Sequence, residues 1–456
     1  MLERIKKAIL CLGVLLFIFF LTSPIHEIST PANRSLGLFF LTFSLWLTRY
    51  LPLSVTGLLV FALIPLLGIL PLSESYSLFG NRAIFFILGS FILAGGLMKT
   101  GLSRRIAFHI ISKFASSGRN LILGVFWTGA VLSFFMPEHA AAAILFPIVI
   151  EMAGILKLRP KESLFSRFLF LSLAWGCVIG GIGTLLGGAR APLAIGMLEE
   201  NFGIRISFLR WSMYAMPVSI GGLLAGTLIL TLALRDTPEV SSFKEKAKEE
   251  LKRMGKLKRD ERVVLFVYIL TLTGWIFFNR WIDISLIAIL SSSLLFLFRG
   301  ITWKDVERWV NWGIILMYAG AMALGVSLVR SGAAAYISQR YFFSLAKTPF
   351  TTLAVFSLLS LVLTEGMSNV ATVALLLPVV YGLPFDPVLL TLCITIPGGL
   401  ALCLPMGTPP NAIAFSSGYY ELRFSIKFGV MLTFILYLIL LLVGRFYWPL
   451  LGVEVW

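Results

Sequence analysis

Long apolar segments, separated by short polar stretches, run along almost the whole chain of 456 residues. A helix needs about 20 predominantly apolar residues to span a bilayer, and most of these segments reach that length. Period-two alternation typical of strands is absent from them, so the spans are expected to be helices. The pattern therefore predicts an all-α protein that crosses a membrane many times.

The stretch Thr364 to Thr372 interrupts this pattern, because small hydroxyl and amide side chains stand there inside an otherwise apolar segment. In the hydrocarbon region, backbone that is not helical occurs only where protein or a cavity shields it. Transporters use such interruptions to present helix ends and carbonyl groups to ions. The stretch predicts the tip of a re-entrant hairpin at about residues 349–381, followed by a broken helix at about 387–418.

One long hydrophilic stretch, Arg235 to Arg262, divides the chain. Its composition predicts an amphipathic surface helix, and its excess of basic over acidic residues places it on the cytoplasmic side. We therefore expect four parts: an N-terminal helix at 1–34, a first half at 35–234, a cytoplasmic linker at 235–262 and a second half at 263–456.

Composition agrees with this class of protein, since 58% of the residues are hydrophobic and 13% are charged, against about 25% charged in soluble domains. The formal net charge of +16 does not indicate a nucleic-acid partner, because the basic residues lie mostly in short loops, where they set topology and contact membrane lipid. Basic residues near the start predict a cytoplasmic N-terminus. Trp448 and Trp456, expected as interfacial anchors, favour a C-terminus on the outside.

The two halves of the chain repeat one another. Two pairs of segments match at an offset of 231 residues, and a third, weaker pair follows in the same order at 220: Met98–Leu102 with Val329–Ala333, Ala140–Pro147 with Ala371–Pro378, and Gly183–Gly187 with Cys403–Gly407. The first half is thus expected to have its own hairpin at about 119–157 and broken helix at about 165–198. Inverted repeats with broken helices in matching positions indicate a binding site near the midplane of the membrane.

The second half carries Ser368-Asn369 at its hairpin tip and Gly407-Thr408-Pro409-Pro410-Asn411 in the broken helix that follows. With Lys99–Leu102 and the basic linker, these motifs make the sequence similar to the divalent anion:sodium symporter family, which includes the dicarboxylate, citrate and sulfate carriers of the ion transporter superfamily. The family's signature is a Ser-Asn-Thr motif at each of two hairpin tips, each partnered by a Gly-Thr-Pro-Pro-Asn loop. The resemblance extends over nearly the whole chain.

The chemistry of this pair of motifs suits ions. Pro409 and Pro410 cannot continue a helix and lack N–H donors, which frees nearby carbonyls, and Gly407 lets backbone approach closely. We expect Thr364, Asn369 and Gly407 to form a possible Na⁺ site, while helix N-termini after the breaks favour an anionic carboxylate. Hydrogen bonding between helices is the alternative use of these polar groups.

The first half departs from the family's pattern. Pro137-Glu138-His139 stands where the first Ser-Asn-Thr motif is expected, and Gly187-Gly188-Ala189-Arg190-Ala191 replaces the first Gly-Thr-Pro-Pro-Asn loop, although Ser133 remains compatible. Ionisable groups within a span are costly to bury and are functional by default. If the hairpin and the broken helix meet as they do in the family, Glu138 and Arg190 are expected to pair.

Three hypotheses remain open for these charged residues, and Ser133, Glu138, His139 and Gly187 are the candidate coupling residues. In the first, fixed protein charge replaces the first sodium site, as in sodium-independent exchange. In the second, Glu138 or His139 takes up the coupling proton. In the third, the Glu138–Arg190 pair only fixes the hairpin. No cofactor is expected beyond Na⁺ or H⁺ as the coupling ion.

The resemblance also implies which residues bind substrate in the two halves: Ser368, Asn369, Val370, Thr408, Pro409, Asn411, Thr184 and Arg190. Val370 replaces a family threonine, which puts the usual dicarboxylate preference in doubt, whereas Arg190 can hold a carboxylate or sulfate directly. Glu365 is expected to brace the hairpin backbone.

The resemblance implies about eleven transmembrane helices plus two re-entrant hairpins, in a homodimer whose transport domains move as elevators against a scaffold. The predicted function is secondary active transport of di- or tricarboxylates, or similar divalent anions, across a bacterial or archaeal plasma membrane. The alternatives are a sulfate, arsenite or Na⁺/H⁺-type carrier of the same superfamily, a non-transporting anion sensor, and a membrane enzyme. An enzyme is disfavoured because clustered acidic or histidine residues are missing.

Overall fold

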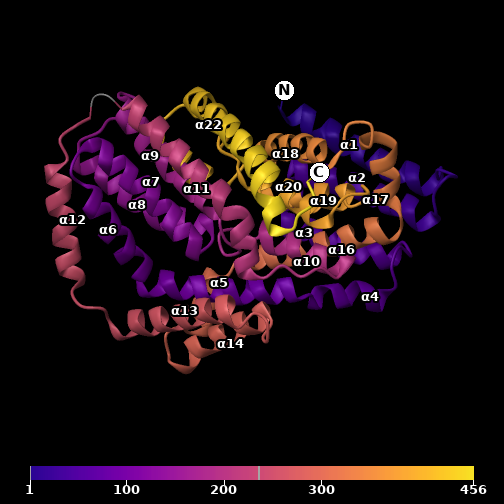
Figure 1. Cartoon of the computed structure of the whole chain (residues 1–456), viewed down its shortest axis with the longest axis horizontal. Coiled ribbons are helices and arrows are strands. Elements are labelled where there is room, and N and C mark those ends of the chain that lie inside the picture. The colour runs from indigo at the N-terminus through magenta and orange to yellow at the C-terminus, as the bar shows by residue number, and fades with distance from the viewer. Residues whose placement is uncertain (1, 235–236, 456) are drawn as a thin grey trace.

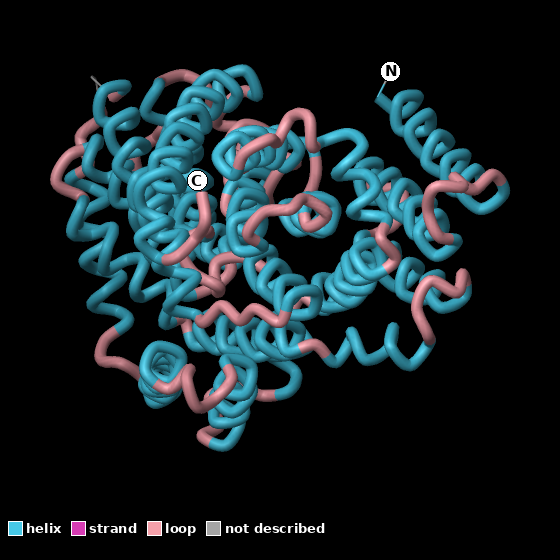
Figure 2. Tube along the Cα trace, turned by 45° about the vertical axis from the view of Figure 1, so that its right-hand side comes forward, coloured by secondary structure: helices cyan, strands magenta, loops and turns pink. Residues whose placement is uncertain are grey.

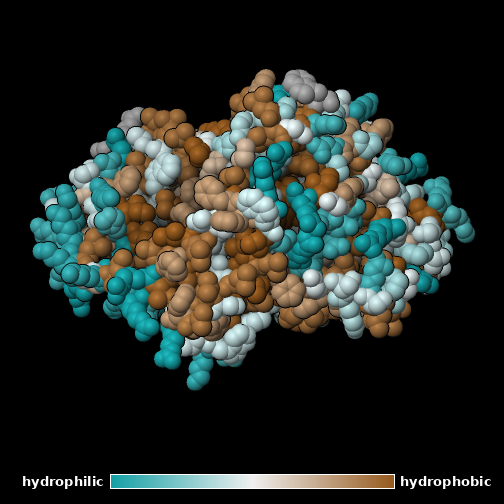
Figure 3. Space-filling view, turned by 60° about the horizontal axis from the view of Figure 1, so that its bottom comes forward, coloured by the Kyte–Doolittle hydropathy of each residue, from teal (hydrophilic) through white to brown (hydrophobic). Residues whose placement is uncertain are grey.

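The computed structural model describes residues 2–234 and 237–455, and in these ranges the chain forms helices and loops without a strand (Figure 2). Nine of the described helices are long and apolar enough to cross a membrane. On the face shown in Figure 3, hydrophobic side chains cover a broad area, and hydrophilic side chains gather at its left end and over part of its right half. Such a surface fits a protein surrounded by lipid.

Eleven helices form a group that we call the frame: α1 (Leu2–Thr22), α2 (Thr30–Thr48), α3 (Leu53–Leu66), α4 (Leu72–Ser77), α5 (Arg82–Thr100), α6 (Leu102–Phe114), α13 (Arg259–Phe277), α14 (Ile284–Leu297), α15 (Trp303–Trp309), α16 (Trp312–Arg330) and α17 (Ala333–Ile337). Within it, α1 packs on α2, α3 on α16 and α5 on α14. The α3–α16 contact is close because Gly57 lies against the backbone of Met317, where a methyl group would meet the Met317 Cα at 2.8 Å.

The remaining long helices form what we call the hairpin group: α7 (Gly118–Phe135), α8 (Glu138–Ile155), α9 (Leu164–Gly181), α10 (Arg190–Phe202), α11 (Phe208–Ala233), α18 (Pro349–Gly366), α19 (Asn369–Val380), α20 (Pro387–Thr395), α21 (Pro409–Ser416) and α22 (Leu422–Leu442). The pairs α7–α8 and α18–α19 are hairpins whose tips contain Pro137 and Ser368. The pairs α9–α10 and α20–α21 are broken helices. Because α9 packs on α21 and α10 on α20, the two breaks face each other.

The linker helix α12 (Ser241–Met254) lies at the left end of the molecule in Figure 1 and buries Phe243 and Ala247. Arg105 of α6 holds the end of this helix, donating to the carbonyls of Met254 and Gly255 at 3.1 and 2.7 Å. Residues 235 and 236, at the start of the expected linker, lie outside the described ranges. We call the surface that carries α12 the linker face.

Several helix ends lie on the linker face. Lys99, at the end of α5, pairs with Asp305 of α15 at 3.0 Å, which places the start of α16 there. Helix α2 runs antiparallel to α16, because Ser29 before α2 donates to the carbonyl of Ser331 after α16. Consequently the end of α2, at Arg49, also lies toward the linker face.

The C-terminal segment lies at the opposite end of α11 from the linker, since Arg210 donates to the carbonyl of Leu451. Trp448 differs from the prediction of an exposed interfacial anchor. Its side chain is fully buried, and its indole N–H donates to the carbonyl of Tyr214 at 3.0 Å. Because its hydrogen-bond acceptor lies on α11, the indole is positioned by packing between helices and not by the membrane interface. Trp456 lies outside the described residues.

The internal repeat of the sequence has structural counterparts. Gly101 after α5 and Gly332 after α16 both adopt left-handed backbone, with φ of 78° and 84°, the conformation that favours glycine at a helix end. Pro147 and Pro378 occupy corresponding places inside α8 and α19. The two halves thus build the same elements in the same order.

Candidate functional site

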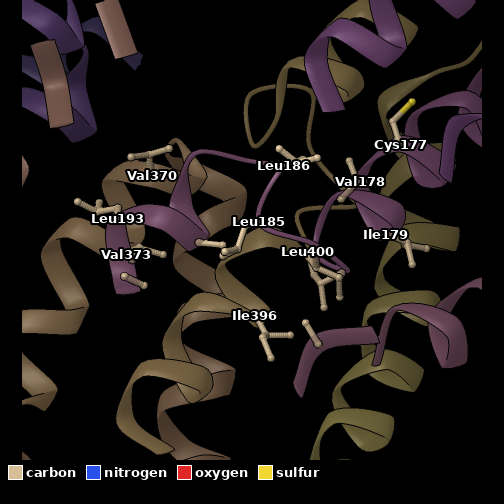
Figure 4. Close-up of a cluster of buried hydrophobic side chains, with 14 of the residues drawn as sticks. Cys177, Val178, Ile179, Leu185, Leu186, Leu193, Val370, Val373, Ile396 and Leu400 are labelled. Carbon is tan, nitrogen blue, oxygen red and sulfur yellow. The ribbon is translucent and has the colours of Figure 1, made fainter. Parts of the chain in front are cut away.

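The hairpin tips and the two helix breaks meet in the middle of the hairpin group. A buried apolar cluster lies where they meet. Figure 4 shows Leu185 and Leu186 of the first break and Leu400 of the second in this cluster, with Val370 and Val373 from α19. Polar groups beside this apolar cluster are shielded from bulk water, which strengthens their electrostatic interactions.

Glu138 and Arg190 form a buried ion pair at the centre of this region. Arg190 Nη1 lies 3.1 Å from Glu138 Oε2, and the two residues are 2% and 4% exposed. The backbone N–H of Glu138 also donates to the carbonyl of Gly187 at 2.9 Å. The sequence-based expectation that these two residues pair therefore agrees with the structure.

The guanidinium of Arg190 fits between two glycines. A methyl group on Gly188 or on Gly399 would overlap its atoms. Gly399 belongs to the second break, so the arginine of the first half reaches into the second half. Arg190 Nη2 is buried and has no hydrogen-bond partner. An unpaired buried N–H of a charged group is costly, and this one is a ready donor to an anionic ligand.

Three oxygen atoms cluster beside this pair at the second hairpin. Thr364 Oγ1 lies 2.8 Å from Asn369 Oδ1 and 2.7 Å from the carbonyl oxygen of Gly398. The hydroxyl has one proton, yet both neighbours are acceptors, so one of these short contacts lacks a hydrogen. Gly407 lies against the carbonyl of Thr364, 3.1 Å from where a Cβ would stand. Neutral oxygens in this arrangement suit a hard cation such as Na⁺.

A cavity of about 890 Å³ opens beside these groups. Residues of both hairpin tips, both breaks and the frame line it: Glu138, His139, Gly188, Ala189, Arg190, Ser368, Asn369, Val370, Pro405, Met406, Gly407, Thr408, Pro409, Ala412, Arg49, Leu51, Pro52, Leu53, Asn311, Ile314 and Met317. Because the frame residues stand at the end of α2 and toward the starts of α3 and α16, the cavity opens toward the linker face.

His139 lies between this cavity and a smaller one of about 350 Å³ against α5 and α15. Its ring packs edge-on against Phe91, with 6.3 Å between the ring centroids. The imidazole therefore borders the site without contacting the Glu138–Arg190 pair through a hydrogen bond among the described residues.

Besides Thr364 of the oxygen cluster, four residues expected at the site do not line the cavity and lie beside it. Thr184 Oγ1 donates to the carbonyl of Phe134 at 2.8 Å and so ties the break to the hairpin. Asn411 donates to the carbonyls of Ala401 and Leu404 within its own break. Backbone carbonyls left free by the breaks take these donors, and the predicted roles of Thr184 and Asn411 in substrate binding stay predictions. The other two are Ser133 and Gly187, which lie on or against the first hairpin.

Glu365 differs from its predicted role as a brace of the hairpin backbone. Its carboxylate accepts the N–H groups of Leu402, Cys403 and Leu404 at 2.8, 2.9 and 2.8 Å. It therefore braces the second helix break and joins the hairpin to it. These N–H groups have no helical partner, which is why a carboxylate is stable there.

Sequence reasoning missed three contributors: Gly398, Gly399 and Arg49. Gly398 acts through its carbonyl and Gly399 through the space it leaves, so neither has a side-chain signal beyond the Pro397-Gly398-Gly399 turn itself. Arg49 ends a frame helix far from both motifs.

The family model described as "Sodium:sulfate symporter transmembrane region" matches residues 2–454 of the chain. The chain belongs to this family. A member of the sodium:sulfate symporter family is a membrane transporter and not an enzyme, and the all-helical fold with many spans is that of a polytopic membrane protein.

Similar proteins include several with the name "Sodium-dependent dicarboxylate transporter SdcS". The one from Staphylococcus saprophyticus is 31% identical, with 98% of this chain and 92% of the relative covered. One from Staphylococcus aureus is 30% identical with the same coverage. Among solved structures, the Alcanivorax borkumensis YdaH transporter has a similar fold, with a TM-score of 0.50, 13% identity and 98% of both chains covered.

Proposed function

We propose that the protein carries a small dicarboxylate dianion across the membrane, coupled to Na⁺. The observation that supports this most is Arg190, which lines the cavity and whose buried Nη2 has no hydrogen-bond partner among the described residues. The helices α10, α19 and α21 begin at this cavity, and the positive ends of their dipoles favour an anion. Several similar proteins bear the name of sodium-dependent dicarboxylate transporters.

In this proposal Na⁺ binds at the second hairpin, held by Thr364 Oγ1, Asn369 Oδ1 and the carbonyl of Gly398, with Gly407 packed beside them. A bound cation offsets the repulsion between these closely spaced oxygens. Its charge also lowers the free energy of binding an anion beside Ser368 and Thr408. These residues keep the neutral ligands that the sequence predicts for the second half.

The first half carries its positive charge in the protein. Arg190 stands where a second cation would help to neutralise the substrate, and Glu138 holds the guanidinium in place through their 3.1 Å contact. A fixed charge needs no ion from solution, so we expect fewer coupling ions than two intact sites would use. Coupling to H⁺ through Glu138 or His139, sodium-independent exchange, and a pair that only fixes the hairpin are the competing outcomes.

We further propose that the hairpin group moves against the frame as an elevator, in a homodimer of the plasma membrane. Every polar residue of the proposed Na⁺ and Arg190 sites belongs to the hairpin group, while the frame contributes one wall of the cavity. Sliding of one group past the other would therefore change which face the cavity opens to. The basic linker favours a cytoplasmic linker face and N-terminus, with the C-terminus outside.

Reconstituted uptake tests this function. Purified protein in proteoliposomes is given labelled succinate, citrate or sulfate, with and without a sodium gradient, a pH gradient and internal counter-substrate. We expect succinate uptake that requires the sodium gradient. Arg190→Gln should abolish it, and the matched control Arg299→Gln, on an exposed loop after α14, should not. Binding without uptake would identify an anion sensor instead, and uptake of sulfate alone would replace the substrate class.

A further inference from the structure

Arg49 is the frame's charged contribution to the cavity. It ends α2 in left-handed backbone, with φ 53° and ψ 35°, and Leu51, Pro52 and Leu53 follow it along the same wall. The helices on either side of this turn pack on α1 and α16. Arg49 therefore belongs to the frame, whereas Arg190 and Asn369 belong to the hairpin group.

Its guanidinium reaches across to the hairpin group. Arg49 Nη2 donates to the carbonyl of Met406 at 2.9 Å, and Met406 directly precedes Gly407 and Thr408 in the second break. This contact uses one of the five N–H groups of an arginine. The others are available to a ligand at the mouth of the cavity, where Arg49 is exposed.

Arg49 is the charged residue of the cavity lining that has no ion-pair partner. Among the described residues, no carboxylate forms an ion pair with Arg49, whereas Arg190 is paired with Glu138. With His139 neutral, Arg49, Arg190 and Glu138 together give the lining one net positive charge. A planar guanidinium of this kind matches a carboxylate through two parallel hydrogen bonds.

We propose that Arg49 determines specificity for dianions by binding the second carboxylate of a substrate whose first carboxylate lies at Arg190. The inference rests on the proposed function and extends it in two ways. A monocarboxylate has no second carboxylate to bind Arg49, so the arginine selects for substrates with two carboxylates. Because Arg49 stays with the frame when the hairpin group moves, it strengthens binding only while the cavity faces the linker side.

The test compares succinate with butyrate, a monocarboxylate of the same chain length. Binding to the purified full-length protein is measured for the wild type, Arg49→Gln and Arg49→Lys. The matched control is Arg299→Gln, since Arg299 is also an exposed arginine that follows a helix in left-handed backbone, with φ 58°. KM for succinate is then measured from each side of the membrane in oriented vesicles.

We expect Arg49→Gln to raise the Kd for succinate roughly 10- to 100-fold, the range for a lost charge-assisted contact, and to leave butyrate unchanged. Arg49→Lys should recover part of the loss, Arg299→Gln should match the wild type, and KM should rise on the linker face alone. Equal losses for succinate and butyrate, unchanged succinate binding, or a KM change equal on both faces would each overturn the inference. A wild type that handles no dicarboxylate would overturn the proposed function itself, and this inference with it.

Discussion

Asn369 Nδ2 donates a hydrogen bond to Glu138 Oε1 at 3.3 Å, although 231 residues separate them. The same offset of 231 relates the two halves of the sequence, so the partners occupy the same place in their repeats. Each is the first residue of the second helix of its hairpin. The duplicated tips therefore touch each other, and the neutral tip of the second half orients the charged tip of the first.

Glu138→Gln removes the counter-ion of a buried guanidinium. Leaving one buried charge unpaired costs about 3–5 kcal/mol, so we expect a marked fall in the melting temperature of the purified protein. The double variant Glu138→Gln/Arg190→Met should recover most of that stability while losing anion binding. If the double variant still bound the anion, the pair would be purely structural.

Gly399→Ala places a methyl group where the Arg190 guanidinium lies. We expect the displaced arginine to lose its position at the cavity and the Kd for succinate to rise roughly tenfold or more, as for a lost hydrogen bond to a charged group. Gly366→Ala is the control, because a methyl group there meets no atom within 4 Å. Equal binding by the two variants would show that Arg190 does not contact the substrate.

Thr364→Val keeps the side-chain shape and removes the hydroxyl that lies near both Asn369 and Gly398. The sodium concentration for half-maximal uptake should rise roughly tenfold, since one ligand of the cation is lost. Ser357→Ala is the control, because this buried hydroxyl of the same helix donates to the carbonyl of Cys393, away from the cluster. The same sodium dependence in both variants would show that the cation does not bind at Thr364.

Glu365→Gln should destabilise the second helix break. The amide keeps one acceptor oxygen and turns an NH₂ group toward N–H groups that need acceptors, so we expect a loss of roughly 2–3 kcal/mol in unfolding free energy. Glu151→Gln on α8 serves as control, since this acid lies away from the break. Thermal unfolding in detergent measures both, and an unchanged Glu365→Gln protein would contradict the bracing role.

The hairpins were predictable because polar residues at Thr364 and Glu138 interrupt apolar sequence, and lipid tolerates such interruptions only at shielded breaks. The repeat then located the hairpin and the break of the first half from those of the second half. The Glu138–Arg190 pair was expected because the resemblance brings the hairpin and the broken helix together, and two buried opposite charges at one site need each other.

The details that the sequence did not reveal depend on backbone and space, which have weak sequence signals. The cation cluster uses the carbonyl of Gly398, and any residue has a carbonyl. Thr184 and Asn411, predicted to bind substrate, donate to backbone carbonyls, because each helix break leaves backbone groups that compete for such side chains. Arg49 reaches the cavity because of how the frame helices pack, and no sequence motif indicates this packing.

The central claim is that one cation site remains and that Arg190 supplies fixed charge in place of the other. The most direct measurement is the ratio of labelled Na⁺ to labelled succinate taken up by proteoliposomes, at pH 7 and pH 8 and without a pH gradient. We expect one sodium ion per succinate, with the same ratio at both pH values. Two or more sodium ions per succinate, or uptake driven by a proton gradient in the absence of sodium, would contradict it.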